Sequence, residues 1–142
     1  MDNLIKIMIV DDDPAVTTML KTKLEKTGKF KVVLTNEAKK ALSLAKKEQP
    51  SLIICDFYMP DMSGGDVALE IANTRKTKHI PVLFLTAGID ETDDTNGMIG
   101  EDHIMSKKSD ISKIIAKIES MLRMLPEKSD TGIIAKVKSI FN

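Results

Sequence analysis

Several features that would indicate other classes of protein are absent from this sequence. Its 142 residues contain one cysteine, Cys55, so no internal disulfide can form, which fits a reducing compartment. Basic and acidic residues balance at 21 each, so charge gives no general reason to expect binding to nucleic acid or to an anionic membrane. No apolar run is long enough to span a membrane, and residues 1–4 contain no basic lead before a long apolar segment. We therefore expect a cytoplasmic protein with no nucleic-acid or membrane partner.

What the sequence does contain is an alternation of short apolar runs with amphipathic stretches. This alternation predicts βα units and a parallel sheet with helices on both faces, which is the doubly wound α/β class. The apolar runs lie at residues 7–10, 30–34, 52–55, 82–85 and 104–105. The helical patterns lie at residues 14–27, 37–47, 65–74, 90–99 and 110–124, and the fourth of these is polar and weakly defined. Asp13 before Pro14 predicts the cap and first residue of the first helix, and Gly28 predicts its end.

The pattern changes near residue 125. Residues 1–125 predict one domain, residues 126–132 a linker, and residues 133–142 a short helix with one apolar stripe. This tail is too short to form an output domain of its own. A helix of about ten residues is marginal alone in water, so we expect the tail to be ordered only when docked and any homodimer to be weak.

Charged and polar residues follow four of the predicted strands. Asp11 and Asp12 follow the first strand, Asp56 the third, Thr86 the fourth and Lys107 the fifth. In an open parallel α/β sheet, ligands bind outside the carboxyl ends of the strands, where the strand order reverses. We therefore expect these side chains to surround one crevice.

The residue types in this crevice predict phosphoryl-transfer chemistry. Asp11, Asp12 and Asp56 would repel one another if all three were ionised and unpaired. A hard divalent cation relieves this repulsion, and carboxylate oxygens suit Mg²⁺. Asp56 is the natural nucleophile, because aspartate can form an aspartyl-phosphate. Lys107 would supply a positive charge to one phosphate oxygen and Thr86 a hydroxyl donor to another.

Four motifs in register resemble the receiver domain of two-component response regulators. The resemblance covers roughly residues 4–125 and is closest to chemotaxis-regulator-like, stand-alone receivers. The motifs are IVDDDP at residues 9–14, IICDFYMPDMSG at 53–64, LTA at 85–87 and SK at 106–107. One acidic pair would be weak evidence, whereas the pair, the aspartate, the Thr-Ala and the lysine in order are strong evidence.

The resemblance implies a flavodoxin-like fold with five parallel strands in the order 2-1-3-4-5. It implies that Asp56 accepts a phosphoryl group from a sensor histidine kinase or a phosphotransfer protein, with self-catalysed transfer and hydrolysis but no other enzyme activity. Asp12, Asp56 and the backbone carbonyl of Tyr58 would bind Mg²⁺ directly, and Asp11 would act through water. Thr86 and Lys107 would contact the phosphate and transmit the resulting conformational change to a downstream protein. That protein would bind the face made by residues 90–99, 104–105 and 110–124.

Two positions depart from the pattern of this family. The lysine is usually followed by proline through a cis bond, but here Lys108 follows, and a cis bond before a non-proline residue costs about 2.5–4 kcal/mol. The trans bond that we expect could aim Lys107 differently. An aromatic residue usually stands three positions before the lysine, where this chain has Ile104, which has no ring to rotate when Thr86 moves.

Two alternative functions compete with the phosphoacceptor switch. A haloacid-dehalogenase-type phosphatase also uses a strand-end aspartate with Mg²⁺, but its nucleophile follows the first strand of a larger chain that carries a cap. A receiver-like interaction module could keep the site and signal without phosphate, as Lys108 and Ile104 suggest. Labelling by a small phosphodonor with Mg²⁺ separates the switch from the interaction module.

Overall fold

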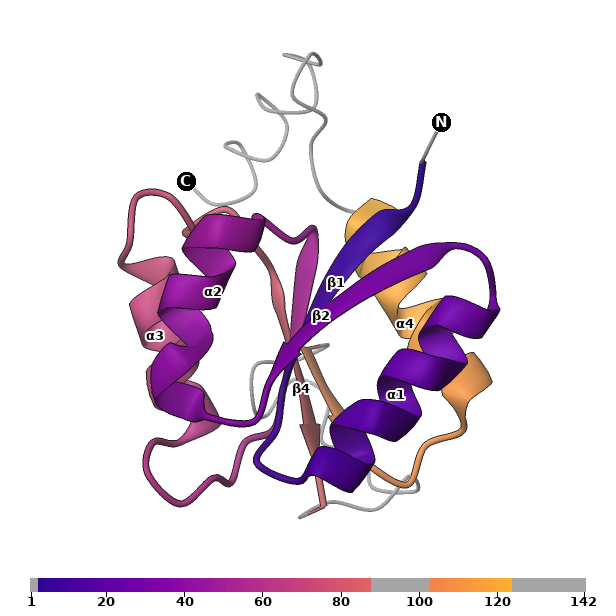
Figure 1. Cartoon of the computed structure of the whole chain (residues 1–142), viewed down its shortest axis with the longest axis horizontal. Coiled ribbons are helices and arrows are strands. Elements are labelled where there is room, and N and C mark those ends of the chain that lie inside the picture. Colours follow the sequence, from indigo (N-terminus) through magenta and orange to yellow (C-terminus); the bar gives the residue numbers. More distant parts are fainter. Residues whose placement is uncertain (1–2, 88–102, 124–142) are drawn as a thin grey trace.

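The described residues, 3–87 and 103–123 of a computed structural model, form a five-stranded parallel sheet covered by helices on both faces (Figure 1). The strand order is β2-β1-β3-β4-β5, which confirms the predicted doubly wound fold. The strands are β1 Ile5–Val10, β2 Phe30–Thr35, β3 Leu52–Cys55, β4 Val82–Thr86 and β5 Ile104–Ser106. The helices are α1 Pro14–Lys26, η1 Ala38–Lys40, α2 Ala41–Glu48, α3 Gly64–Ala72 and α4 Ile111–Arg123.

Two apolar cores form because successive side chains of a strand point to opposite faces of the sheet. In β1, Ile7 and Ile9 belong to the core under α1 and α4, whereas Met8 and Val10 belong to the core under α2 and α3. The same alternation holds in β3. Its four residues are all buried, as expected for the central strand of a sheet covered on both faces.

The predicted start and end of the first helix are confirmed. Asp13 caps α1, with its side chain accepting from the backbone N–H of Ala15 at 2.9 Å, and Pro14 is the first helical residue. Gly28 follows the helix with φ +80°, a conformation that glycine adopts without steric cost. This cap is important for the site, because it begins the helix directly after the acidic residues that follow β1.

Some predicted boundaries change. The pattern at residues 37–47 divides into the 3-10 turn η1 and the helix α2, and the short fifth strand extends to Ser106. The helix predicted at residues 90–99 and the linker and helix predicted at 126–142 lie outside the described residues. Among the described helices, none combines the length and apolar character needed to cross a membrane.

Candidate functional site

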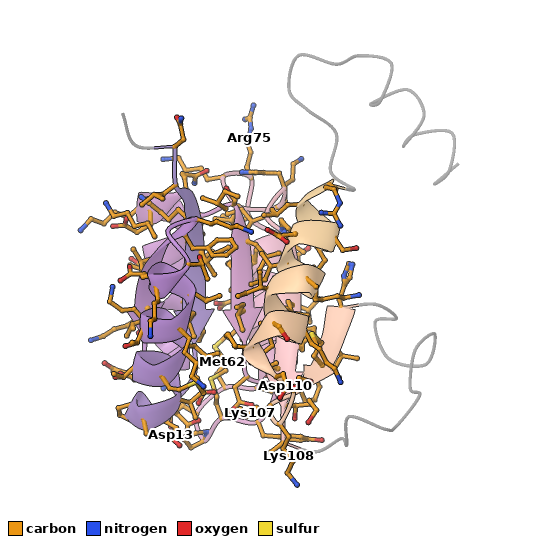
Figure 2. The ribbon with its side chains drawn as sticks, turned by 90° about the vertical axis from the view of Figure 1, so that its right-hand side faces the viewer. Asp13, Met62, Arg75, Lys107, Lys108 and Asp110 are labelled. Carbon is orange, nitrogen blue, oxygen red and sulfur yellow. The ribbon has the colours of Figure 1, made fainter. Side chains whose placement is uncertain are left out.

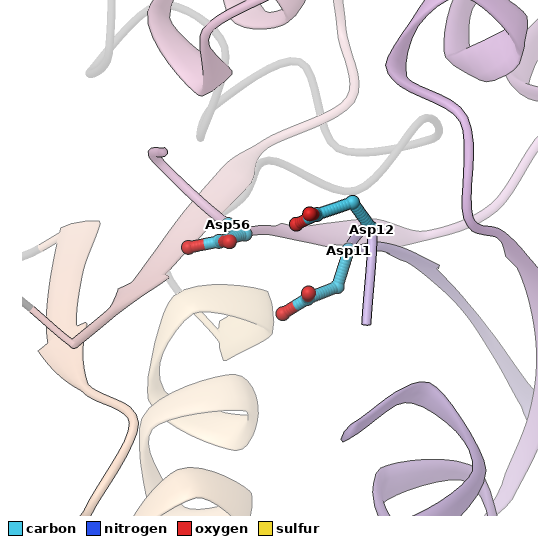
Figure 3. Close-up of side chains that lie close together, drawn as sticks. All are labelled: Asp11, Asp12 and Asp56. Atoms are coloured by element: carbon cyan, nitrogen blue, oxygen red, sulfur yellow. The ribbon is translucent and has the colours of Figure 1, made fainter. Parts of the chain in front are cut away.

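Three carboxylates meet at the carboxyl ends of β1 and β3 (Figure 3). Asp11 and Asp12 follow β1, and Asp56 follows β3, its neighbour in the sheet. Each residue offers a carboxylate oxygen, and these oxygens lie within 4.8 Å of one another. Asp11 is only 3% exposed and Asp56 5% exposed, whereas Asp12 faces solvent. The sequence predicted this meeting of the three side chains.

Backbone and amide groups fix the loop that carries Asp11. The N–H of Asp13 donates to Oδ1 of Asp11 at 2.9 Å, so the carboxylate closes a tight turn before α1. The side-chain Nδ2 of Asn36 donates to the backbone carbonyl of Asp11 at 2.8 Å and to the hydroxyl of Thr17 at 3.0 Å. One amide therefore connects the loop after β2, the loop after β1 and the first turns of α1.

The backbone of Asp56 is fixed by the sheet on one side and by Gly64 on the other. Its N–H donates to the carbonyl of Val10 at 2.9 Å. The N–H of Gly64 donates to the carbonyl of Phe57 at 2.8 Å, and a Cβ at position 64 would lie 2.3 Å from the carbonyl oxygen of Asp56. Only glycine allows α3 to begin this close to the acidic site.

Lys107 supplies the counter-charge inside the site. Its Nζ lies 2.9 Å from Oδ2 of Asp11 and 3.1 Å from Oδ2 of Asp56. Its backbone N–H donates to the carbonyl of Thr86 at 2.9 Å, which ties the end of β5 to the end of β4. Figure 2 shows Lys107 at the same end of the molecule as Asp13, the residue that caps α1.

Burial and pairing shift the pKa values of three groups at the site. Burial raises the pKa of Asp11 above its usual value, although hydrogen bonds from Lys107 and from the N–H of Asp13 act against this rise. Burial would lower the pKa of Lys107, but its hydrogen bonds to Asp11 and Asp56 outweigh burial and raise it. Burial beside the two carboxylates raises the pKa of Cys55 to about 12, so its thiol stays protonated at neutral pH.

The donor set fits a hard divalent cation. The three carboxylates carry three negative charges when ionised, and Lys107 returns one, which leaves two to be neutralised. The oxygens belong to carboxylates, the type of ligand that Mg²⁺ prefers over softer metals. The one thiol nearby, Cys55, is fully buried and protonated, so it is no competing ligand.

The other predicted site residues, Thr86 and Tyr58, lie at the same edge of the sheet. Thr86 is buried at the end of β4, beside Ser106 of β5. Tyr58 is 66% exposed, and its ring meets the edge of the Phe57 ring at 5.2 Å between centroids. A metal-binding role for the backbone carbonyl of Tyr58 stays a prediction.

The structure describes both residues that depart from the family pattern, Lys108 and Ile104. The bond between Lys107 and Lys108 is trans, and the N–H of Lys108 donates to the hydroxyl of Ser106 at 3.0 Å. The trans bond is as expected, and the Nζ of Lys107 contacts two carboxylates. Ile104 is buried and pairs with Phe84 of β4.

The sequence analysis missed the positioning role of Asn36. It is the first residue after β2, a strand to which we assigned no site residue. Its place at a strand's carboxyl end was the available signal, because the other site residues share it. Nothing local in the sequence distinguishes it from an ordinary turn asparagine.

Comparisons with known proteins support the family resemblance of the sequence. The family model described as the response regulator receiver domain matches residues 7–119. The alkaline phosphatase synthesis transcriptional regulatory protein PhoP of Bacillus subtilis (strain 168) is 31% identical over 119 residues, which are 83% of this chain and 48% of that protein. The DNA-binding dual master transcriptional regulator RpaA of Synechocystis sp. is 33% identical over 119 residues, 83% of this chain and 49% of that protein. The chain therefore spans about half the length of these curated relatives.

Solved structures are similar over nearly their whole length. A response regulator from Desulfuromonas acetoxidans has a TM-score of 0.73 and 25% identity, with 86% of this chain and 99% of that chain covered. The chemotaxis response regulator CheY4 of Vibrio cholerae has a TM-score of 0.69 over 82% of this chain and 98% of that chain. At 22% identity, the second similarity concerns the fold alone.

Proposed function

Because the chain belongs to the family of response regulator receiver domains, we propose that it is a switch in a two-component phosphorelay and that Asp56 is its phosphoacceptor. One observation carries this proposal. Asp56 is a nearly buried carboxylate with Asp11 and Asp12 within 4.8 Å and the Nζ of Lys107 at 3.1 Å. Asp11 also lies beside Lys107, but its two oxygens are already engaged, one by the N–H of Asp13 at 2.9 Å and the other by Lys107 at 2.9 Å.

In this mechanism an oxygen of Asp56 attacks the phosphorus atom of a phosphohistidine or an acyl phosphate. The Asp56 O–P bond forms while the bond from phosphorus to the donor breaks, and the donor group leaves with the electron pair of that bond. Lys107 offers a positive charge to a phosphoryl oxygen, and Thr86 offers its hydroxyl to another. Positioning is the main contribution of the site here, because holding the two reacting groups in the right geometry makes the transfer effectively unimolecular.

Mg²⁺ would be held by Asp11, Asp12 and Asp56, with the Tyr58 carbonyl as a further ligand. When bound, the ion supplies the positive charge that compensates the oxygens around phosphorus during transfer. The two negative charges that Lys107 leaves uncompensated support a divalent cation in preference to a monovalent one.

The donor in this proposal is a sensor histidine kinase or a phosphotransfer protein. A groove of about 480 Å³ between α1 and the start of α4 opens beside Lys107, and it supports docking of the donor there. Its lining includes Val16, Met19, Lys23, Lys108 and Ile111. The downstream protein would bind the face that includes β5 and α4. Residues 90–99 of that face lie outside the described residues.

Labelling by acetyl phosphate tests this function. The wild-type chain should gain one phosphoryl group in the presence of Mg²⁺, measured by intact-protein mass spectrometry, and chelation should prevent the gain. Asp56→Asn should remove the labelling, whereas Asp61→Asn, a change at an exposed aspartate of the same loop, should preserve it. Undiminished labelling of Asp56→Asn would show that another residue is the acceptor. No labelling of the wild-type chain would favour an interaction module that signals without phosphate.

A further inference from the structure

Five cations gather at the end of the molecule opposite the acidic site. Figure 2 shows Arg75 at one end and Lys107 and Asp13 at the other. All five side chains are exposed, and they come from the last turn of α2 and from the loop between α3 and β4. The basic end, as we name this set, consists of Lys46, Lys47, Arg75, Lys76 and Lys78.

The two parts of the basic end are held together by Gln49. Its Nε2 donates to the carbonyl of Lys46 at 3.2 Å and to the carbonyl of Lys76 at 3.1 Å. Gln49 has φ 47°, a left-handed conformation that a non-glycine residue adopts at some cost. Within the loop, Thr77 is fully buried and donates its hydroxyl to the carbonyl of Ile71 at 2.8 Å. The cations therefore project from a backbone that is fixed before any partner binds.

The cations of the basic end differ from several lysines elsewhere in the described part of the chain, which form ion pairs. Four lysines elsewhere lie 2.8 to 3.1 Å from a glutamate, namely Lys6, Lys21, Lys29 and Lys40. Within residues 3–87 and 103–123, no ion pair engages a member of the basic end. The helix dipole favours cations in a last turn, where Lys46 and Lys47 lie on α2, whereas the last turn of α3 contains no basic residue.

An open hollow on α2 adjoins the basic end. It measures about 350 Å³ and is lined by Lys40, Ser43, Leu44 and Lys47. Lys47 also belongs to the basic end, so the two surfaces are continuous. Leu44 is half-buried and lines the hollow together with two lysines. This arrangement suits a chain that carries an apolar side chain between acidic ones.

We propose that the basic end and this hollow dock an acidic segment of a partner protein, with an apolar side chain over Leu44 and carboxylates on the surrounding cations. Single-stranded nucleic acid is held largely by aromatic side chains that stack on bases, and this surface has none. A membrane surface takes up apolar side chains that project from the protein, whereas Leu44 is half-buried in the lining of a hollow. Carboxylates separated by an apolar residue match both features at once.

Binding of a short fluorescein-labelled peptide rich in Glu, Asp and Leu tests this proposal by fluorescence anisotropy. We expect binding that weakens at least about tenfold when salt rises from roughly 0.05 M to 0.5 M, because screening acts strongly on exposed charges. Arg75→Glu with Lys76→Glu should weaken binding by about tenfold or more. The matched control reverses two exposed lysines of α1 and β2, Lys26→Glu with Lys31→Glu, and should bind as the wild type does.

Three outcomes would overturn the proposal. One is the absence of peptide binding at low salt, and another is an equal loss in the two charge-reversal variants. The third is tighter binding of a single-stranded oligonucleotide or of phosphatidylserine vesicles than of the peptide, since this would assign the surface to phosphate groups. Labelling of Asp56 by acetyl phosphate should be unchanged in the Arg75 and Lys76 variant, so this test stands apart from that of the phosphoacceptor.

Discussion

Replacing Lys107 with methionine should destabilise the protein strongly, and the loss should depend on Mg²⁺ and on pH. The substitution keeps an unbranched side chain of similar length but removes the charge. Asp11 and Asp56 would then remain 3% and 5% exposed with no cation at 2.9 and 3.1 Å. Exposed ion pairs contribute little, but these carboxylates have lost most of their contact with water.

The magnitude follows from the burial of these charges. Removing one partner of a buried ion pair typically costs 3–5 kcal/mol, because the other charge is left without compensation. We expect Lys107→Met to lower the free energy of unfolding by about 3 kcal/mol in the absence of metal. This value is at the low end of the range because Asp12 faces solvent and the cluster can take up a proton. Such a loss would be a substantial fraction of the total stability of a domain, which is commonly about 5–15 kcal/mol.

The pH dependence has a definite sign. The raised pKa of Lys107 means that its pairing stabilises the fold fully below the unfolded value of 10.5, and that this contribution is lost as the pH rises through the folded pKa. The raised pKa of Asp11 also makes stability fall as the pH rises. Ionising this buried carboxyl costs the folded state more free energy than it costs the unfolded chain. Protonation of Asp11 at acid pH removes part of the need for a counter-charge. The difference between wild type and variant should therefore shrink towards about pH 3.

Urea unfolding with a chelator, and again with about 10 mM Mg²⁺, measures these effects. Mg²⁺ should stabilise the variant more than the wild type, because it replaces the missing charge. Lys108→Met is the matched control, since Lys108 is exposed and its side chain takes part in no described ion pair. A loss below about 1 kcal/mol, a loss equal to that of the control, or the same response to Mg²⁺ in variant and wild type would refute this account of the site.

Three further predictions concern other side chains. Asp12→Ala should weaken Mg²⁺ binding in a metal titration more than Asp13→Ala, which should instead cost about 1 kcal/mol in urea unfolding because it removes the cap of α1. Cys55, fully buried with a pKa of about 12, should react with iodoacetamide only when urea unfolds the chain, and rapid alkylation under native conditions would contradict this. Hydrogen bonds from Lys21 and from the backbone N–H of Val32 in the edge strand β2 lower the pKa of Glu25. The stabilisation that ionised Glu25 provides is therefore present above about pH 4.5 and is lost as the pH falls through the folded pKa. The stability difference between Glu25→Gln and wild type should accordingly be present at neutral pH and close in acid, and a gap that persists in acid would count against this pairing.

The sheet and the meeting of the site residues could be predicted from the sequence because both depend on short-range patterns. Each strand is a brief apolar run, and parallel strands bring their carboxyl ends to one edge. Asp11, Asp56 and Lys107 each follow such a run, so their proximity needs only the topology. The cap of α1 at Asp13 was predictable for a similar reason, because caps depend on a few adjacent residues.

The contacts that shape the site were not predictable, since they depend on side-chain direction and on distant backbone. The amide of Asn36 reaches the carbonyl of Asp11, 25 positions away in the sequence. Gly64 was recognised only as part of a motif, whereas the structure shows that a Cβ there would collide with the carbonyl of Asp56. The sequence also left the direction of Lys107 open, because Lys108 replaces the usual proline. The hydrogen bond from the N–H of Lys108 to Ser106 gives this turn an anchor of its own.

The charge balance of the site bears on the proposed phosphorylation of Asp56. Lys107 contacts both Asp11 and Asp56, so a single ammonium compensates two carboxylates at distances of 2.9 and 3.1 Å. A divalent cation among the same oxygens would take over this compensation and leave the lysine available for a phosphoryl oxygen. Since the backbone of Lys107 is hydrogen-bonded to Thr86, a change in the position of the lysine would act directly on the end of β4. This hydrogen bond offers the proposed switch a route from the site to the β4–β5 ends that does not involve Ile104.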